Sequence, residues 1–112
     1  MSTDIHDVVR DLTKLVGPTS VKILADVTDY GPDLAGWLGR TKQPTPDQEK
    51  RLRTALELIE MFDDLKQARV WFRSENTFLR KKGWATSPCV AIQRGYYTDA
   101  RRSAKQTVAE LK

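Results

Sequence analysis

Residues 69–95, RVWFRSENTFLRKKGWATSPCVAIQRG, decide the fold that the sequence predicts. Trp71 and Phe72 end one helical pattern, where two large adjacent apolar side chains can anchor that helix in a core. Asn76 follows as a residue that caps a helix or turns the chain. Leu79 then returns the chain to the same core, and the three consecutive cations after it, Arg80, Lys81 and Lys82, predict an exposed basic corner.

A further short helix is predicted at the end of this stretch. Ser87 is a favoured N-cap residue, Pro88 suits the first helical position, and Gly95 can end the helix. These signals predict a helix over residues 88–94. Its predicted apolar face comprises Val90 and Ala91, with Cys89 or Ile92 as alternatives.

Seven residues of this stretch resemble the pattern W-x-x-S-x-N-x-x-L…P-x-x-x-I-x-x-G, which belongs to the toxin-binding domain of Xre/MbcA/ParS-type antitoxins. The matching residues are Trp71, Ser74, Asn76, Leu79, Pro88, Ile92 and Gly95. The resemblance implies an all-helical fold in which an Xre-like helix-turn-helix region precedes the toxin-binding domain. It also implies a partner, namely a RES-domain toxin that destroys NAD.

The composition predicts a small globular protein. A chain of 112 residues can bury a core without metal or disulfide support. Cys89 is the single cysteine and cannot form an internal disulfide, which fits a reducing cytoplasm. No apolar run reaches the length of a membrane span, and the polar, acidic N-terminus does not resemble a signal peptide. We therefore expect a soluble cytoplasmic protein without membrane contact.

Residues 1–64 are interpreted as a helix-turn-helix-like DNA-binding region. Ser2 or Thr3 can cap a first helix, whose apolar residues are Ile5, Val8, Val9, Leu12 and Val16. A second helix is expected to start at Thr19 or Ser20 and to break near residues 28–31. The third helix opens at Pro32 and directs Leu34, Ala35 and Trp37 inward. A helical hairpin that serves packing alone gives the same pattern.

The predicted third helix has few side chains suited to reading bases. Asp33 and Gly36 are expected to face outward, so the useful donors come only in the following basic loop. Arg40 and Lys42 could there straddle a phosphate backbone, with Thr41 between them. We therefore expect phosphate contact rather than base readout at this loop.

A long helix begins at Thr45, with Pro46 at the first helical position and Gln48 at the capping-box position. Its predicted core stripe is Leu52, Ala55, Leu56, Ile59 and Phe62. A final helix follows residue 95. Its inward residues are expected to be Ala100, Ala104, Val108 and Leu111.

The charge is distributed unevenly along the chain. Residues 1–64 contain 8 Lys+Arg and 12 Asp+Glu, a net charge of −4, whereas residues 65–112 contain 11 and 3, a net charge of +8. The second part is interpreted as a basic region that resembles the toxin-binding domain. Basic clusters attract polyanions or acidic protein surfaces, although a solvated face gives the same pattern. The predicted DNA-binding residues are Tyr30, Arg40, Thr41, Lys42, Arg73, Arg80, Lys81, Lys82, Arg101, Arg102 and Lys105.

The sequence shows no convergent catalytic set. With one histidine, His6, and one cysteine, it contains neither a nucleophile motif nor a metal-ligand spacing, and no cofactor is expected. Two hypotheses remain open. The first is a DNA-binding repressor, chromosomal or from a phage or mobile element, that contacts double-stranded DNA through both regions. The second is an antitoxin that inhibits a RES-type toxin, with DNA binding secondary. Either could self-associate as a homo-oligomer.

Overall fold

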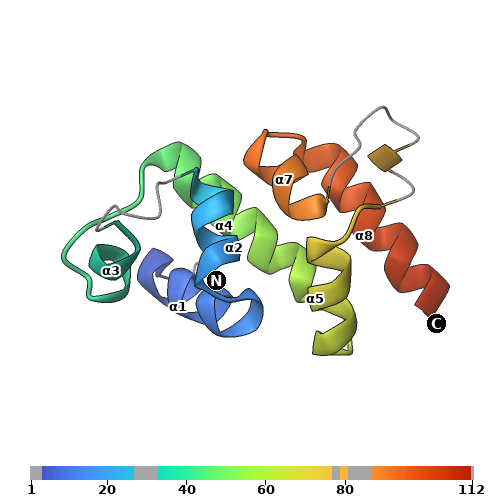
Figure 1. The fold of residues 1–112 in the computed structure, drawn as a ribbon, viewed down its shortest axis with the longest axis horizontal. Helices are drawn as coiled ribbons and strands as arrows, with labels where there is room; N and C mark the ends of the chain where they lie inside the picture. Colours follow the sequence, from blue (N-terminus) through green and yellow to red (C-terminus); the bar gives the residue numbers. More distant parts are fainter. Residues whose placement is uncertain (1–3, 27–32, 77–78, 81–86, 112) are drawn as a thin grey trace.

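The computed structural model describes residues 4–26, 33–76, 79–80 and 87–111. These residues form α-helices and no strand, so the predicted all-α fold is confirmed (Figure 1). The helices are α1 (Ile5–Val16), α2 (Pro18–Ala25), α3 (Asp33–Leu38), α4 (Pro46–Ile59), α5 (Leu65–Arg73), α7 (Pro88–Gln93) and α8 (Tyr97–Leu111). Each helix in the described part of the chain is too short or too polar to cross a lipid bilayer.

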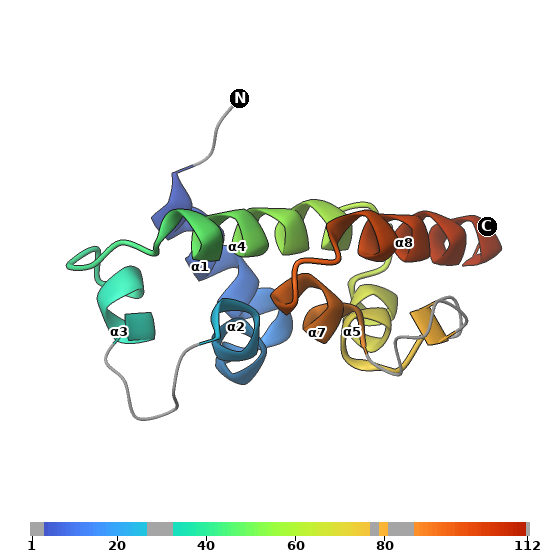
Figure 2. The ribbon, with the colours of Figure 1, turned by 90° about the horizontal axis from the view of Figure 1, so that it is seen from above.

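The helix α4 is the central element of the fold. Helices from both ends of the sequence pack on it, namely α1, α2, α5, α7 and α8 (Figures 1 and 2). One cluster of buried side chains includes Val9 of α1, Leu58 of α4 and Ala104 of α8. Residues on both sides of position 64 therefore share a hydrophobic core. The functional division into residues 1–64 and 65–112 stays a prediction.

Local capping signals place two helices as the sequence predicts. The Thr45 hydroxyl accepts from the Gln48 amide, and the Gln48 side chain accepts from the Thr45 amide, which forms the capping box of α4. The Ser87 side chain accepts from the Val90 amide at the start of α7. The whole predicted core stripe of α4 is buried, including Phe62 just beyond its end.

Thr45→Ala should lower the free energy of unfolding by about 1 kcal/mol, because it removes a cap that satisfies a backbone N–H at the start of α4. Urea denaturation measures this. Thr98→Ala is the matched control, since Thr98 is exposed and its hydroxyl bonds to no described residue; its effect should stay within about 0.5 kcal/mol. Equal losses in the two variants would show that the capping box does not stabilise the fold.

Two helix starts differ from the prediction. Asp4 caps α1 by accepting from the His6 amide at 2.8 Å. The predicted caps Ser2 and Thr3 lie outside the described residues. The second helix begins at Pro18, not at Thr19 or Ser20, because proline suits the first helical position. It ends at Ala25, where Asp26 adopts a left-handed conformation with φ of 57°.

Several side chains face a different way from the prediction. Gly36 is buried and Ala35 is exposed, because the aliphatic stem of Lys42 lies over the glycine, where a Cβ would come within 2.8 Å of Lys42 Cγ. Leu111 was expected inward but is 48% exposed. It lies at the end of α8, which extends past α4 (Figure 2). Val90 is only half-buried, whereas Cys89 and Ile92 are buried in α7.

The helix-turn-helix interpretation stays a prediction. Its expected turn, including Tyr30, and the expected start of the third helix at Pro32 fall within residues 27–32, outside the described residues. The helix α3 packs against α1. His6 of α1 takes part in this contact, since its Nδ1 lies 2.9 Å from the Trp37 carbonyl oxygen. This half-buried histidine therefore joins two helices.

Candidate functional site

A largely apolar groove of about 340 Å³ lies between α5 and α8. Its lining comes from α5, the residues directly after it and the second half of α8. The lining residues are Lys66, Gln67, Val70, Trp71, Ser74, Glu75, Asn76, Thr107 and Leu111. A volume of this size is at the lower end of the range for binding pockets.

Trp71 forms the fixed floor of the groove. The side chain is 5% exposed, and its Nε1–H donates to the Ser103 hydroxyl of α8 at 3.0 Å. Its ring also packs against Phe62 and Phe72, with centroid distances of 5.2 and 6.3 Å. Because Trp71 has contacts on several sides, the floor is set by the core and does not depend on a ligand.

The walls of the groove carry two exposed apolar side chains. Val70 of α5 is 60% exposed and Leu111 of α8 is 48% exposed. A smaller cavity of about 110 Å³ shares Gln67 and Leu111 with the groove and reaches Phe62. The apolar surface therefore continues along α5 toward the end of α4. Exposed apolar side chains beside a groove are available to contact another molecule.

The residues of the antitoxin-like pattern separate into two groups. Trp71, Ser74 and Asn76 line the groove. The Asn76 Oδ1 also accepts from the Leu79 amide at 3.2 Å, so Asn76 caps the helical turn at residues 79–80 that follows it. Of the remaining pattern residues, Leu79, Pro88 and Ile92 are buried in the core, and Gly95 has a positive φ of 87° at the end of α7.

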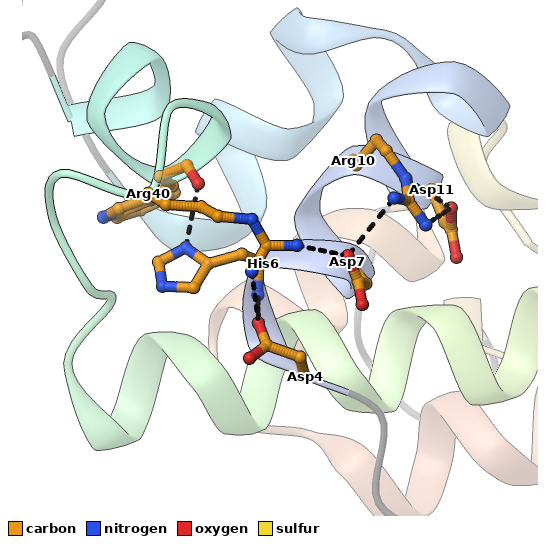
Figure 3. Close-up of polar contacts among 7 residues, drawn as sticks. Asp4, His6, Asp7, Arg10, Asp11 and Arg40 are labelled. Carbon is orange, nitrogen blue, oxygen red and sulfur yellow. Dashed lines mark hydrogen bonds and ion pairs between the residues drawn. The ribbon is translucent and has the colours of Figure 1, made fainter.

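The predicted cations at the end of α3 are paired with carboxylates. Arg40 contacts Asp4 at 3.4 Å and Asp7 at 2.6 Å (Figure 3). The pKa of Asp4 is lowered, mainly because the carboxylate accepts from the His6 amide, and the Arg40 charge adds to this effect. Lys42 lies 3.4 Å from Asp33.

Thr41 and Arg73 both bond to backbone carbonyl oxygens. The Thr41 hydroxyl donates to the Gly36 carbonyl at 3.4 Å. Arg73 donates to the carbonyl of Val16, so its guanidinium caps the C-terminal end of α1. This contact joins α5 to α1 across the sequence.

The basic residues of the second half differ in their partners. Arg80 pairs with Glu75, and Arg101 of α8 lies 2.8 Å from Glu57 of α4. Arg102 and Lys105 are exposed and have no ion-pair partner within the described ranges. Tyr30, Lys81 and Lys82 lie outside the described residues.

The described candidate DNA-binding residues do not form one cluster. The helix α3 and the C-terminal end of α8 lie at opposite ends of the molecule, whose longest dimension is 40 Å (Figure 1). Arg40 and Lys42 are therefore separated from the cations of α8. Their role in DNA binding stays a prediction.

The groove was not predicted from the sequence, although one signal for it was present. Val70 is an apolar residue off the buried face of α5, which comprises Ala68, Trp71 and Phe72. An apolar residue on a polar helix face can mark a binding surface, but a single one is common on any protein.

Within the part of the chain that the structure describes, no three His, Cys, Asp or Glu side chains are grouped so as to hold a metal ion. The chain matches no protein-family model, no curated protein and no solved structure. The resemblance to the Xre/MbcA/ParS-type antitoxins therefore stays an expectation from the sequence.

Proposed function

We propose that the protein is a regulator of the antitoxin type that binds a partner protein in the groove between α5 and α8. One observation carries this proposal. Trp71, Ser74 and Asn76, which belong to the pattern that resembles the toxin-binding domain, line an open apolar groove. Val70 and Leu111 leave apolar surface exposed at the same place. Burying that surface against a partner would favour binding.

The chemistry of the groove favours an amphipathic helix of the partner as its occupant. Two helices form the walls, and a helix that lies in such a groove inserts apolar side chains spaced three or four residues apart. The charged lining residues, Lys66 and Glu75, are opposite in sign, so the lining favours an apolar face without net charge. Amide and hydroxyl groups of Gln67 and Thr107 can pair with polar atoms at the edge of that face.

The test uses the full chain and the protein encoded by the neighbouring gene. We expect the neighbouring protein to arrest growth when it is expressed alone and to form a stable complex with this chain that restores growth. Size-exclusion chromatography and a growth assay measure the two effects. A neighbouring protein that is harmless and does not bind would contradict the antitoxin function.

DNA binding is a second candidate function, and the exposed cations of α8 favour it. Arg102 and Lys105 project from α8 without an ion-pair partner among the described residues, in the part of the chain with a net charge of +8. Unpaired cations can contact phosphates without first breaking an ion pair. Arg40 and Lys42, in contrast, would have to leave Asp7 and Asp33.

Replacing Arg102 and Lys105 together by alanine should weaken binding to double-stranded DNA and lower the salt dependence of log K by about two units, one for each lost phosphate contact. Fluorescence anisotropy of a labelled duplex at several salt concentrations measures both quantities. The matched control is the double variant Arg40→Ala, Lys42→Ala, which should change the slope less. If the α8 variant kept its affinity and slope, this surface of α8 would not contact DNA.

A further inference from the structure

A second cavity, of about 400 Å³, lies between the start of α2, the end of α5 and the start of α7. The helices α2 and α7 pack side by side at this place (Figure 2). The lining residues that matter here are Thr19, Ser20 and Ile23 of α2, Arg73 of α5, and Cys89 and Val90 of α7. Among the described residues that line this cavity, none carries a carboxylate.

Ser20 is a largely buried polar residue of α2. It is 6% exposed, and its hydroxyl forms no hydrogen bond with any residue that the structure describes. It also lines the cavity. A hydroxyl that lines the cavity and bonds to no described residue can donate a hydrogen bond to a ligand held there.

The start of α2 presents further donors to the same cavity. Gly17 is the N-cap of α2 and provides no side-chain hydrogen bond, and Pro18 has no N–H. The amides of Thr19 and Ser20 precede the first intrahelical hydrogen bond, which the Val21 amide donates to the Gly17 carbonyl. Within the part of the chain that the structure describes, these two N–H groups at the positive end of the α2 dipole have no backbone partner and can bind an anion.

Arg73 supplies the positive charge. Its guanidinium has five N–H donors, and the described hydrogen bond to Val16 uses one of its nitrogens. The neighbouring thiol does not oppose an anion, because burial raises the pKa of Cys89 to about 12 and keeps it neutral. The Cys89 Sγ lies 3.8 Å from the Ser20 carbonyl oxygen, to which the S–H donates.

We propose that this cavity binds the phosphate group of a small molecule, held by the Arg73 guanidinium, the Ser20 hydroxyl and the amides of Thr19 and Ser20. The number of converging donors exceeds what the two oxygens of a carboxylate accept with good geometry, whereas a phosphate has three terminal oxygens. Ile23, which is 44% exposed, and Val90 lie in the same cavity and would contact an apolar part of the ligand.

Inorganic phosphate is the probe for this site, titrated into the full chain and followed by the amide resonances in nuclear magnetic resonance spectra. We expect saturable shifts at Thr19 and Ser20, and much smaller shifts with acetate or chloride at equal ionic strength. Ser20→Ala should weaken phosphate binding about tenfold without loss of folding, because the hydroxyl has no described partner to lose. Arg73→Gln should weaken it further.

Thr98→Ala is the matched control, since Thr98 is exposed near the start of α8 and is not among the lining residues of this cavity or of the groove. Its affinity for phosphate should equal that of the unmodified protein. Because Arg73 also bonds to Val16, the Ser20 variant decides the outcome if the Arg73 variant is unstable. Shifts that do not saturate, equal shifts with acetate, or unchanged affinity in Ser20→Ala would overturn the proposal.

Discussion

Trp71→Ala should lower the free energy of unfolding by about 3 to 5 kcal/mol, the range found for large aromatic side chains in cores. The side chain is 5% exposed and packs against Phe62 and Phe72. Its truncation also leaves the buried Ser103 hydroxyl without the N–H that it accepts. Both losses act at the junction of α5 with α8, and chemical denaturation measures their sum.

Trp71→Phe separates the two contributions. Phenylalanine retains an aromatic ring beside Phe62 but cannot donate the hydrogen bond to Ser103. Trp71→Phe should therefore lower the free energy of unfolding clearly less than Trp71→Ala does. A loss below about 1 kcal/mol for Trp71→Ala would contradict a core position for this residue. It would also remove the basis for a groove with a fixed floor.

The double variant Val70→Glu, Leu111→Glu should abolish binding of the partner protein, with a loss in affinity of about a hundredfold or more. Both side chains are exposed in the free protein, so the substitutions should leave the fold intact. In the complex, each carboxylate would be buried in an apolar interface without a partner charge, which is strongly unfavourable. Isothermal titration calorimetry with the neighbouring-gene product measures the effect.

Leu38→Glu is the matched control for this variant. Leu38 is 43% exposed, similar to Leu111, but it lies in α3 at the other end of the molecule (Figure 1). Its affinity should stay within about twofold of the unmodified protein, since surface changes away from a binding site have small effects. If both variants bound equally well, the partner site would lie elsewhere.

The sequence predicts the helices best where the signal is local. The Thr45 capping box and the Ser87-Pro88 start depend on residues within one helical turn, and the structure confirms both helices. The apolar stripe of α4 is also fully buried, because a period of 3.6 residues places its members on one face. Trp71 was also expected in the core, because it ends a helical apolar pattern, and it is buried.

The candidate site could not be predicted in the same way, because it depends on contacts between distant residues. Arg73 caps α1 through Val16, which precedes it by 57 positions. Arg40 is paired with Asp7, 33 positions before it. A count of charges along the chain cannot show such pairs. The groove likewise exists only because α8 lies beside Trp71, a placement that no local pattern specifies.

The most direct test of the proposed partner site is a methyl-resolved nuclear magnetic resonance titration of the full chain with the neighbouring-gene product. If the partner binds in the groove, we expect large chemical-shift changes at the methyl groups of Val70 and Leu111, which line it. We expect little chemical-shift change at Leu38 and Ile23, which are exposed to a similar degree as Leu111 but lie outside the groove. Changes centred on Leu38 or Ile23, with Val70 and Leu111 unaffected, would contradict the groove as the site of partner binding.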